Sequence, residues 1–275
     1  MNYILNFNNI TKYYNKLVAL DNVTINIPEN SIYGILGPNG SGKSTLFRIA
    51  SNLILKYSGI VTFEGKILNR SSIDLINSFG FLIENPSFYE YLTGQQNLEL
   101  LHRISQYNSN DINNILKLVE LSDRANDKVK TYSYGMKQRL GLAQTLLHNP
   151  KILILDEPNN GLDPEGIINM SNIIKRLHED GKTIILSTHI LTEIELLCTH
   201  FTILKNGKNI ASKSMKNLFS NSNYYMIEVK NIKTAIKLLS KMDTIEILST
   251  TNNFINFTSK NKIDNSFFEK LFKNK

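Results

Sequence analysis

Apolar and polar residues alternate along much of the first 80 positions. The runs NYILNFNNI and NVTINI have the period of two that is typical of β-strands with one buried face. SIYGIL is a short, largely apolar strand candidate that leads directly into GPNGSGKS, and TLFRIASNLI then has the spacing of an amphipathic helix. We therefore expect a strand-rich region that contains one strand–loop–helix unit.

From Asn85 to about Pro150 the apolar positions recur at helical spacing. The segments that show it are TGQQNLELLHRISQ, DINNILKLVEL and MKQRLGLAQTLLHN. The third helix is expected to begin within YSYGMKQR, because Ser133 is a favourable N-cap residue. Free N–H groups at such a helix start attract anions, so this position is also a candidate phosphate contact.

Strands and helices alternate again after Pro150. KILILDEP and TIILSTH are nearly unbroken apolar runs, which are typical of parallel strands buried on both faces. Between them, PEGIINMSNIIKRLHEDG predicts a helix that ends at Gly181, and FTILKNGKNIA predicts a hairpin with Asn206-Gly207 as its turn. The sequence therefore predicts an α/β fold in which a parallel core surrounds an inserted helical segment.

The pattern changes at about Lys213, where a short polar connection begins. It is followed by a strand candidate, a helix candidate, two further strand candidates and a final helix. In order, the four candidates before that helix are YYMIEV, IKTAIKLLSKM, TIEILST and FINFTSK. We expect residues 1–212 to form the main domain and residues 213–275 to form a small α+β accessory region.

The positive charge of the chain is concentrated near its end. Residues 1–204 carry 18 Lys and Arg against 19 Asp and Glu, whereas residues 205–275 carry 13 against 5. A basic region can meet nucleic acid, anionic lipid or an acidic partner. A solvated, lysine-rich surface with no partner is the interpretation that this composition favours.

Composition and length are those of a globular protein with a sizeable core. Of the 275 residues, 41% are hydrophobic and 20% are charged. No apolar run approaches the roughly 18 residues of a membrane span, and the first residues lack the features of a signal peptide, so we expect neither. The single cysteine, Cys198, cannot form an internal disulfide, which favours a reducing, cytoplasmic location.

The stretch GPNGSGKS matches G-x-x-x-x-G-K-[ST] between a predicted strand and a predicted helix. Its glycines let successive N–H groups face one phosphate. Lys43 can reach the terminal phosphates of a nucleotide, and the Ser44 hydroxyl can bind Mg²⁺. The residues expected to bind the phosphates of a nucleotide here are Gly37, Pro38, Asn39, Gly40, Ser41, Gly42, Lys43, Ser44 and Thr45.

Acidic residues and a histidine follow the two buried strands. Asp156 and Glu157 end one strand, and His189 ends the next, at the sheet edge where ligands of open parallel sheets bind. Asp156 is a candidate Mg²⁺ ligand, Glu157 can polarise the attacking water, and His189 can reach a γ-phosphate. Phosphoryl transfer depends mainly on such positioning and charge, so all three are candidate catalytic-site residues.

In this order, the motifs resemble those of ATP-binding cassettes of ABC transporters, over roughly residues 3–212. GPNGSGKST resembles the Walker A motif, ILILDE the Walker B motif, NGLDP the D-loop, and His189 the switch histidine. The resemblance implies a P-loop NTPase fold with an antiparallel β subdomain and a helical subdomain of about residues 85–150. It also implies that Tyr14, in TKYYN, stacks on adenine and that Asp163 belongs to the nucleotide site.

YSYGM occupies the position of the family signature, usually LSGGQ. In this family the signature of one cassette closes over ATP held by the Walker A motif of another. The resemblance therefore implies that Ser133 and Gly135 serve a phosphate in a second cassette, identical or different. Tyr134 stands where the family most often has glycine, and Met136 replaces the usual glutamine. Because Ser133 and Gly135 are retained, we expect this signature to function.

A second departure lies in FGFLIENPSFYEYLTGQQNL, at the position of the Q-loop. Glu84 replaces the expected glutamine and is predicted to approach Mg²⁺ and to contribute to catalysis. IENPSFYEYLT, GMKQR and an accessory tail together resemble the ATPases of bacitracin and lantibiotic self-protection transporters. The alternative interpretation is that Glu84, which has nearly the same shape as glutamine, is simply tolerated at this position and gives no information about the substrate.

The resemblance predicts an ATP-hydrolysing subunit that powers a separate transmembrane permease. ATP and Mg²⁺ are the expected ligands, and contact with the permease would place the chain at the cytoplasmic face of the membrane. The alternatives are a non-transport ABC ATPase that acts on nucleic acid or ribosomes, and a metabolic phosphate-loop kinase. The kinase is disfavoured because the signature and the D-loop have no role in such an enzyme. Non-transport ABC ATPases usually carry two cassettes in one chain or a long coiled coil, and this sequence has neither, so no nucleic-acid partner is expected. Substrate, transport direction and the identity of the permease are not encoded in these motifs.

Overall fold

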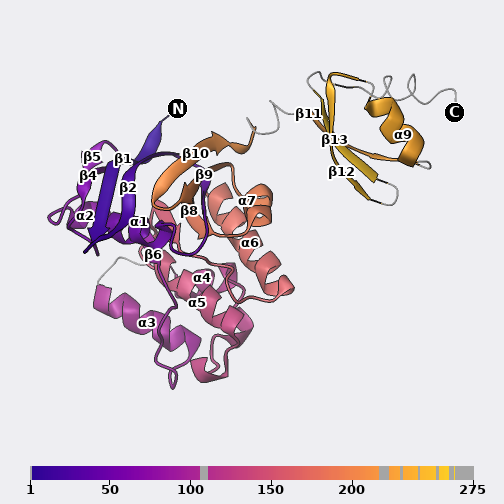
Figure 1. Ribbon diagram of the computed structural model, residues 1–275. Coiled ribbons are helices and arrows are strands. Elements are labelled where there is room, and N and C mark those ends of the chain that lie inside the picture. Colours follow the sequence, from indigo (N-terminus) through magenta and orange to yellow (C-terminus); the bar gives the residue numbers. More distant parts are fainter. Residues whose placement is uncertain are drawn as a thin grey trace. The chain divides into compact units, whose positions relative to one another are not determined.

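A computed structural model describes residues 2–105, 111–216, 223–229, 232–240, 242–251, 254–259 and 263. The chain divides into two compact units, Met1–Ser212 and Lys213–Lys275 (Figure 1). Each unit has a sheet and a hydrophobic core of its own. The two units are therefore described separately.

A mixed sheet of six strands forms the centre of the first unit, in the order β10-β9-β3-β8-β7-β6 within the described residues. The strand pairs from β9 to β6 are parallel. β7 and β8 are completely buried, as their apolar runs predict. The strands are β3 (Ile32–Leu36), β6 (Phe79–Leu82), β7 (Ile152–Leu155), β8 (Thr183–Thr188), β9 (His200–Lys205) and β10 (Lys208–Ser214). The predicted Asn206-Gly207 turn is confirmed, and both residues have positive φ.

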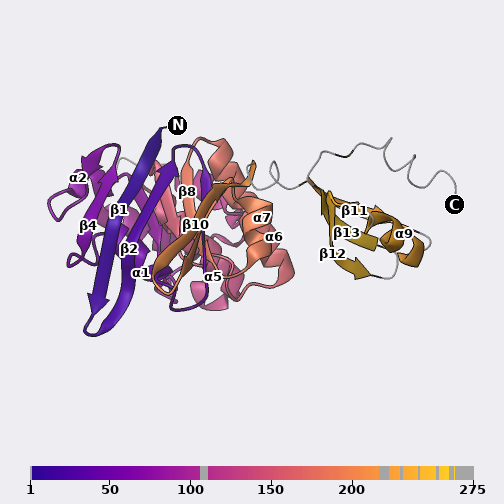
Figure 2. The same ribbon diagram turned by 45° about the horizontal axis from the view of Figure 1, so that its top comes forward.

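An antiparallel sheet of order β2-β1-β4-β5 lies beside the first one (Figures 1 and 2). Its strands are β1 (Tyr3–Tyr14), β2 (Leu17–Pro28), β4 (Ser58–Phe63) and β5 (Lys66–Ile67). One hydrophobic core joins the inward-facing residues of both sheets to helix α1 (Lys43–Ala50), which contributes Leu46, Phe47 and Ile49. This shared core holds the start of α1 at the edge of the parallel sheet.

The expected helical segment is present between β6 and β7. It contains α3 (Gly94–Ser105), α4 (Ile112–Leu118) and α5 (Tyr134–Leu146), with 3₁₀ turns at Ser122–Arg124 and Val129–Thr131. The predicted start of the third helix is confirmed, because the Ser133 side chain caps α5 by accepting the Met136 N–H at 3.2 Å. A short helix, α2 (Ile73–Ile76), precedes this segment and was not predicted.

Helices α6 (Pro164–Glu179) and α7 (Leu191–Leu197) lie next to each other near β8 (Figures 1 and 2). Asp163 caps α6 by accepting the Gly166 N–H at 2.9 Å. The helix stops just before Gly181, which adopts φ +86° as predicted for a terminating glycine. The structure adds α7, which lacks a side-chain cap at Ile190 and was not predicted.

Within its described residues, the second unit is a three-stranded antiparallel sheet of order β11-β13-β12 with one helix packed on it. Its elements are β11 (Asn223–Glu228), α9 (Ile232–Leu239), β12 (Ile245–Thr251) and β13 (Phe254–Ser259). Ala235 and Leu239 of α9 pack on Ile255 and Phe257 of β13. The three strands and this helix agree with the pattern of the sequence, whereas the expected final helix lies outside the described residues.

Candidate functional site

The phosphate loop is shaped by glycines at its two tightest points. Gly40 and Gly42 have φ values of +78° and +108°, in the region that L side chains rarely adopt. A Cβ atom at Gly42 would lie 2.7 Å from the carbonyl oxygen of Ala19, so the neighbouring strand also excludes a side chain there. The loop therefore folds tightly between β3 and α1, at the carboxyl edge of the parallel sheet.

Lys43 is folded into this loop and is only 5% exposed. Its Nζ donates to the carbonyl oxygens of Gly37 at 2.8 Å and Pro38 at 3.3 Å, and it lies 3.2 Å from Glu157 Oε1. The Ser41 hydroxyl is buried nearby and has no hydrogen-bond partner among the described residues. A buried ammonium, an unpaired hydroxyl and a glycine cradle are together suited to hold phosphate oxygens.

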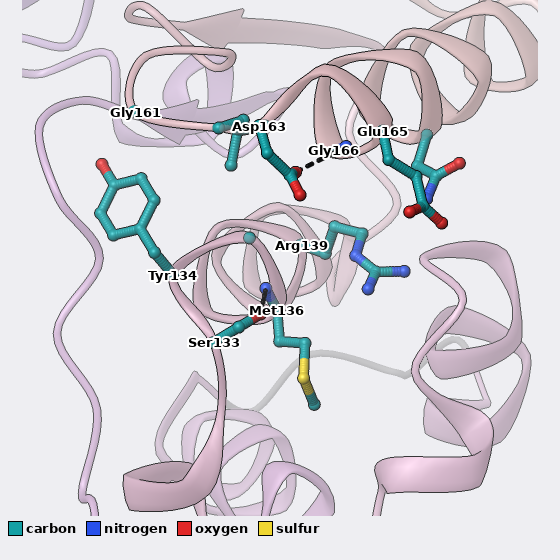
Figure 3. Close-up of a pocket in the computed structure, with 11 residues that line it drawn as sticks. Ser133, Tyr134, Met136, Arg139, Gly161, Asp163, Glu165 and Gly166 are labelled. Carbon is teal, nitrogen blue, oxygen red and sulfur yellow. Dashed lines mark hydrogen bonds between the residues drawn. The ribbon is translucent and has the colours of Figure 1, made fainter.

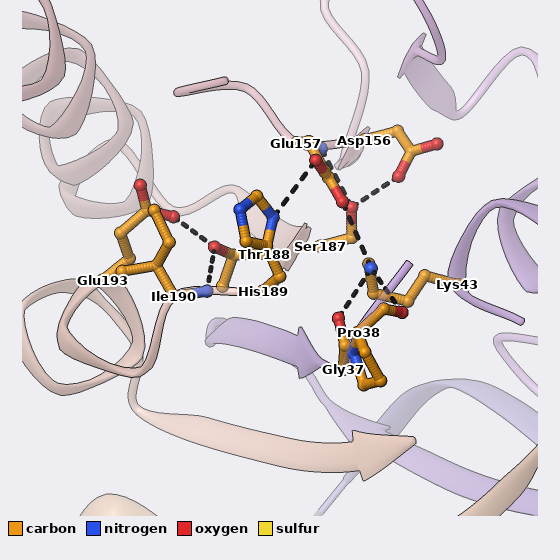
Figure 4. Close-up of polar contacts among 10 residues, drawn as sticks. All are labelled: Gly37, Pro38, Lys43, Asp156, Glu157, Ser187, Thr188, His189, Ile190 and Glu193. Atoms are coloured by element: carbon orange, nitrogen blue, oxygen red, sulfur yellow. Dashed lines mark hydrogen bonds and ion pairs between the residues drawn. The ribbon is translucent and has the colours of Figure 1, made fainter. Parts of the chain in front are cut away.

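The acidic residues after β7 are fixed by Ser187, a residue that the sequence pattern did not predict to belong to the site (Figure 4). Ser187 Oγ donates to Asp156 Oδ1 at 2.5 Å and accepts the Glu157 N–H at 2.9 Å. Glu157 itself has φ +47°. The signal for Ser187 is its place in STH, at the end of the strand that pairs with β7, but a contact between two strands is visible only in the structure.

Glu157 also connects the phosphate loop to His189. His189 Nδ1 lies 3.4 Å from Glu157 Oε2, while the other carboxylate oxygen faces Lys43 (Figure 4). His189 follows Thr188, whose hydroxyl accepts the Ile190 N–H and donates to Glu193. The structure thus brings Lys43, Asp156, Glu157 and His189 together, as their positions at strand ends predict.

A cavity of about 400 Å³ lies over the phosphate loop. One end is lined by Asn39, Gly40, Gly42, Lys43, Ser44, Thr45 and Glu157, and the other by Tyr14, Leu17, Val18 and Ala19. Tyr14, Leu17 and Val18 are exposed apolar side chains at the turn between β1 and β2. This end offers a flat apolar surface beside a phosphate site, which suits the base of a nucleotide. Leu17 and Val18 were not predicted, since nothing local distinguishes them from other strand residues.

A second cavity, of about 340 Å³, lies between the start of α5 and the start of α6 (Figure 3). It is lined by Ser133, Tyr134, Gly135, Met136, Arg139, Gly161, Leu162, Asp163, Glu165, Gly166 and Asn169. The signature and D-loop residues therefore share one cavity, and none of the described residues lines both cavities. Within one chain, Ser133, Gly135 and Asp163 are not brought to the phosphate loop.

Glu84 is placed differently from the other predicted site residues. Its carboxylate pairs with the Arg48 guanidinium on α1, its side chain is 63% exposed, and it lines neither cavity. Glu84 has φ +67°, so the backbone turns sharply at this position. In this arrangement the Glu84 carboxylate is held by Arg48 of α1.

Over the part of the chain that the structure describes, no group of three or more His, Cys, Asp or Glu side chains is arranged to hold a metal ion. Among the same residues, no helix has the length and hydrophobicity needed to cross a bilayer.

Comparison with known proteins agrees with this geometry. The sequence model of the family described as "ABC transporter" matches residues 20–160. The "Uncharacterized ABC transporter ATP-binding protein YhcH" of Bacillus subtilis (strain 168) is 40% identical over 256 residues, which are 92% of this chain and 83% of that protein. The "Lantibiotic transport ATP-binding protein SrtF" of Streptococcus pyogenes is 39% identical over 224 residues (79% and 96%). The "Bacitracin transport ATP-binding protein BcrA" of Bacillus licheniformis is 36% identical over 244 residues (88% and 80%).

Solved structures of ATP-binding cassettes have the same fold. The ADP conformation of MJ1267, an ATP-binding cassette of an ABC transporter, superposes with a TM-score of 0.71 at 26% identity, covering 80% of this chain and 94% of that one. The dimeric post-hydrolysis state of the cassette MJ0796, bound to ADP and Pi, gives 0.68 at 29% identity, covering 77% and 98%. The P-loop NTPase fold expected from the sequence is confirmed. The chain belongs to the ABC transporter family and is an ATP-binding cassette of the kind that hydrolyses ATP.

Proposed function

We propose that this ATPase powers a separate permease in the export of a peptide antibiotic or in protection against one. The class of substrate is supported by similarity to the relatives named for lantibiotic and bacitracin transport. Those names describe the relatives. The similarity of each relative to this chain extends over most of this chain and most of the relative. The substrate itself would be handled by the permease, because the two cavities of the cassette are lined by the phosphate-loop, signature and D-loop residues proposed to contact ATP.

The catalytic assignment follows from the position of Glu157 between Lys43 and His189. In the proposed site, the phosphate loop, Lys43 and Ser41 bind the phosphates, and Tyr14 stacks on the adenine. Glu157 orients the attacking water and accepts its proton, while His189 contacts the γ-phosphate. The pairing of Glu157 with both Lys43 and His189 is the single observation that carries this assignment. Phosphoryl transfer needs little more than positioned charge, which this arrangement supplies.

Ser44 and Asp156 are the proposed ligands of Mg²⁺. Mg²⁺ is bound through one or two carboxylates together with substrate phosphates and waters, so a set of one hydroxyl and one carboxylate fits it. When bound, the ion neutralises charge on the phosphate oxygens. Ser187 holds the Asp156 carboxylate in place through its 2.5 Å hydrogen bond. Glu84 is a proposed additional ligand only if its loop leaves Arg48 as the site closes.

A complete site is proposed to need two cassettes. The signature residues Ser133 and Gly135, with Asp163 of the D-loop, would complete the phosphate site of the second subunit. The separation of the two cavities within one chain supports this arrangement. The relative MJ0796 is described as dimeric with ADP and Pi bound. The second cassette is a further copy of this chain in the simplest form of the proposal.

The permease would hold the cassette at the cytoplasmic face of the membrane. The test of the substrate proposal uses a susceptible bacterial host that carries this chain together with the permease that co-purifies with it. Growth inhibition by a lantibiotic, by bacitracin and by a non-peptide antibiotic would be compared between the wild type and Glu157→Gln. We expect the wild type alone to raise the inhibitory concentration of a peptide antibiotic and to leave the non-peptide control unchanged. Equal susceptibility of the two strains to both peptides would contradict the proposed substrate class.

A further inference from the structure

Tyr134 stands where the family signature most often has glycine, and its hydroxyl joins two segments that are distant in sequence. It donates a hydrogen bond to Asn85 Oδ1 at 2.9 Å and accepts one from Gln138 Nε2, also at 2.9 Å. Gln138 Nε2 is itself 3.5 Å from the same Asn85 oxygen. We call these three residues the Tyr134 triad. Gln138 is buried in α5, whereas Asn85 lies in the loop after β6.

The ring of Tyr134 makes a second contact, with the D-loop (Figure 3). Gly161 has φ +75°, and a Cβ atom there would lie 3.1 Å from Tyr134 Cε1. The ring therefore covers Gly161, two residues before the Asp163 that caps α6. A glycine at position 134 would provide neither the hydroxyl contact nor the ring contact.

Asn85 follows Glu84, and the two residues bind different helices. Glu84 pairs with Arg48 on α1, the helix that begins with Lys43, while Asn85 binds Tyr134 at the first position of α5. These two contacts link the phosphate-loop helix to the signature helix through one short loop. The sequence departs from the family pattern at Glu84 and at Tyr134, and the structure joins these two positions through Asn85.

Tyr134 is 44% exposed, so its contribution to the core is small and its effect is on the position of its neighbours. We propose that Tyr134 is a positioning residue that fixes the signature loop against Asn85 and Gly161. It thereby sets the orientation in which Ser133 and Gly135 meet the nucleotide of a second cassette. This inference rests on the proposed cross-subunit site. It assigns no role to Tyr134 in binding ATP at the phosphate loop of its own chain.

The test measures kcat and KM for ATP in the purified full-length chain and in Tyr134→Phe, Asn85→Ala and the double variant. Tyr134→Phe keeps the ring on Gly161 and removes only the hydroxyl. From the net free-energy contribution of one hydrogen bond, we expect kcat to fall about fivefold in each single variant, with KM unchanged. Because both changes remove the same bond, the double variant should lose no more than the worse single one.

Two further variants separate positioning from a general structural effect. Asn85→Asp keeps an acceptor oxygen for the hydroxyl and should restore kcat, while Tyr91→Phe removes a hydroxyl from a side chain that is 82% exposed and should change nothing. Binding of a fluorescent ATP analogue to the single variants should equal that of the wild type. An unchanged kcat in Tyr134→Phe, additive losses in the double variant, no recovery in Asn85→Asp, or weaker binding of the analogue would each overturn the inference.

A failure of the cross-subunit site itself would give a different result. Mixing Lys43→Ala with Ser133→Arg subunits tests that site without changing Tyr134. If the mixture regains activity and Tyr134→Phe has wild-type kinetics, only the role of Tyr134 is rejected. If the mixture stays inactive although the subunits exchange, the proposed site is rejected, and the inference about Tyr134 falls with it.

Discussion

Glu157 is the residue at which most contacts of the candidate site converge. Its carboxylate faces Lys43 on one side and His189 on the other, and its N–H is held by Ser187. Glu157 has a positive φ where the chain leaves β7. Non-glycine residues adopt this backbone conformation at a cost in conformational free energy. Such strain is often found at functional sites, which agrees with a catalytic role for Glu157.

Replacing Glu157 by glutamine tests that role. Glu157→Gln keeps the shape of the side chain and removes the base, so turnover should fall roughly 100-fold or more while ATP binding persists. Hydrolysis of radiolabelled ATP and equilibrium binding of the nucleotide measure the two effects separately. Lys43→Ala is the matched control and should instead weaken binding. Near-normal turnover in Glu157→Gln would remove Glu157 from the catalytic role.

Cys198 provides a pH-dependent probe of the folded chain. Burial raises the pKa of its thiol to about 12, and its Sγ would lie 2.8 Å from a Cβ atom at Gly34 of β3. Because the thiolate is the reactive form, iodoacetamide at pH 8 should alkylate Cys198 slowly in the native chain and rapidly in urea. Mass spectrometry measures the extent of modification. Equal rates in both conditions would show that the thiol is accessible.

The same pKa shift predicts how stability depends on pH. The folded state favours the neutral thiol, so this contribution is complete below the ordinary thiol pKa of 9.0 and is lost as the pH rises toward about 12. Urea midpoints measured between pH 8 and 11 should therefore fall more steeply in the wild type than in Cys198→Ala, which has no thiol to ionise.

Individual residues differ in how far the sequence could predict their place. Lys43, Asp156, Glu157 and His189 were predictable because each sits at the end of a strand or at the start of a helix. The sequence could not predict that Ser187 would fix Asp156, since the contact depends on the pairing of β7 with β8. It also gave no indication that Arg48 would hold Glu84.

Among the elements, the phosphate loop depends most on a single residue type. Gly42 combines φ +108° with a close approach to Ala19 on β2. A side chain at this position would push the antiparallel sheet away from α1. The loop, the adenine end of the cavity and the core shared by the two sheets therefore depend on one another.

Gly42→Ala and Gly65→Ala form a matched pair that tests this dependence. Gly65, in the turn between β4 and β5, also has positive φ, at +76°, but a Cβ atom there would meet nothing within 4 Å. Both substitutions carry backbone strain of about 1–3 kcal/mol, and only Gly42→Ala adds a steric clash. Thermal unfolding should show a larger loss of stability for Gly42→Ala, together with loss of nucleotide binding. Equal losses in the two variants would mean that the contact with Ala19 is unimportant.

Regular hydrophobic patterns predicted most of the elements. β7 follows an unbroken apolar run, β8 has an apolar centre, and α6 has apolar residues at helical spacing. Ser133 correctly predicted the start of α5. The sequence did not predict that β1 continues to Tyr14, because Lys12 and Tyr13 break the alternation and are ordered by backbone pairing with β2. α7 was missed because it is short and begins without a side-chain cap.

At the scale of the whole molecule, the chain carries two half-sites that do not meet. The phosphate loop with Glu157 forms one cavity, and the signature with the D-loop forms another, both within Met1–Ser212. The basic residues near the end of the chain belong largely to the separate C-terminal unit, Lys213–Lys275. This separation is what the proposed two-cassette site requires, because the cavity with the phosphate loop and the cavity with the signature would then come from different subunits.

The most direct test of this account mixes two inactive variants. Lys43→Ala subunits have a defective phosphate loop and an intact signature, and Ser133→Arg subunits have the reverse. A heterodimer of the two contains one intact composite site, so the mixture should regain part of the wild-type ATPase rate while each variant alone stays inactive. Light scattering and subunit exchange with a labelled copy establish that heterodimers form. An inactive mixture in which exchange is complete would contradict the account.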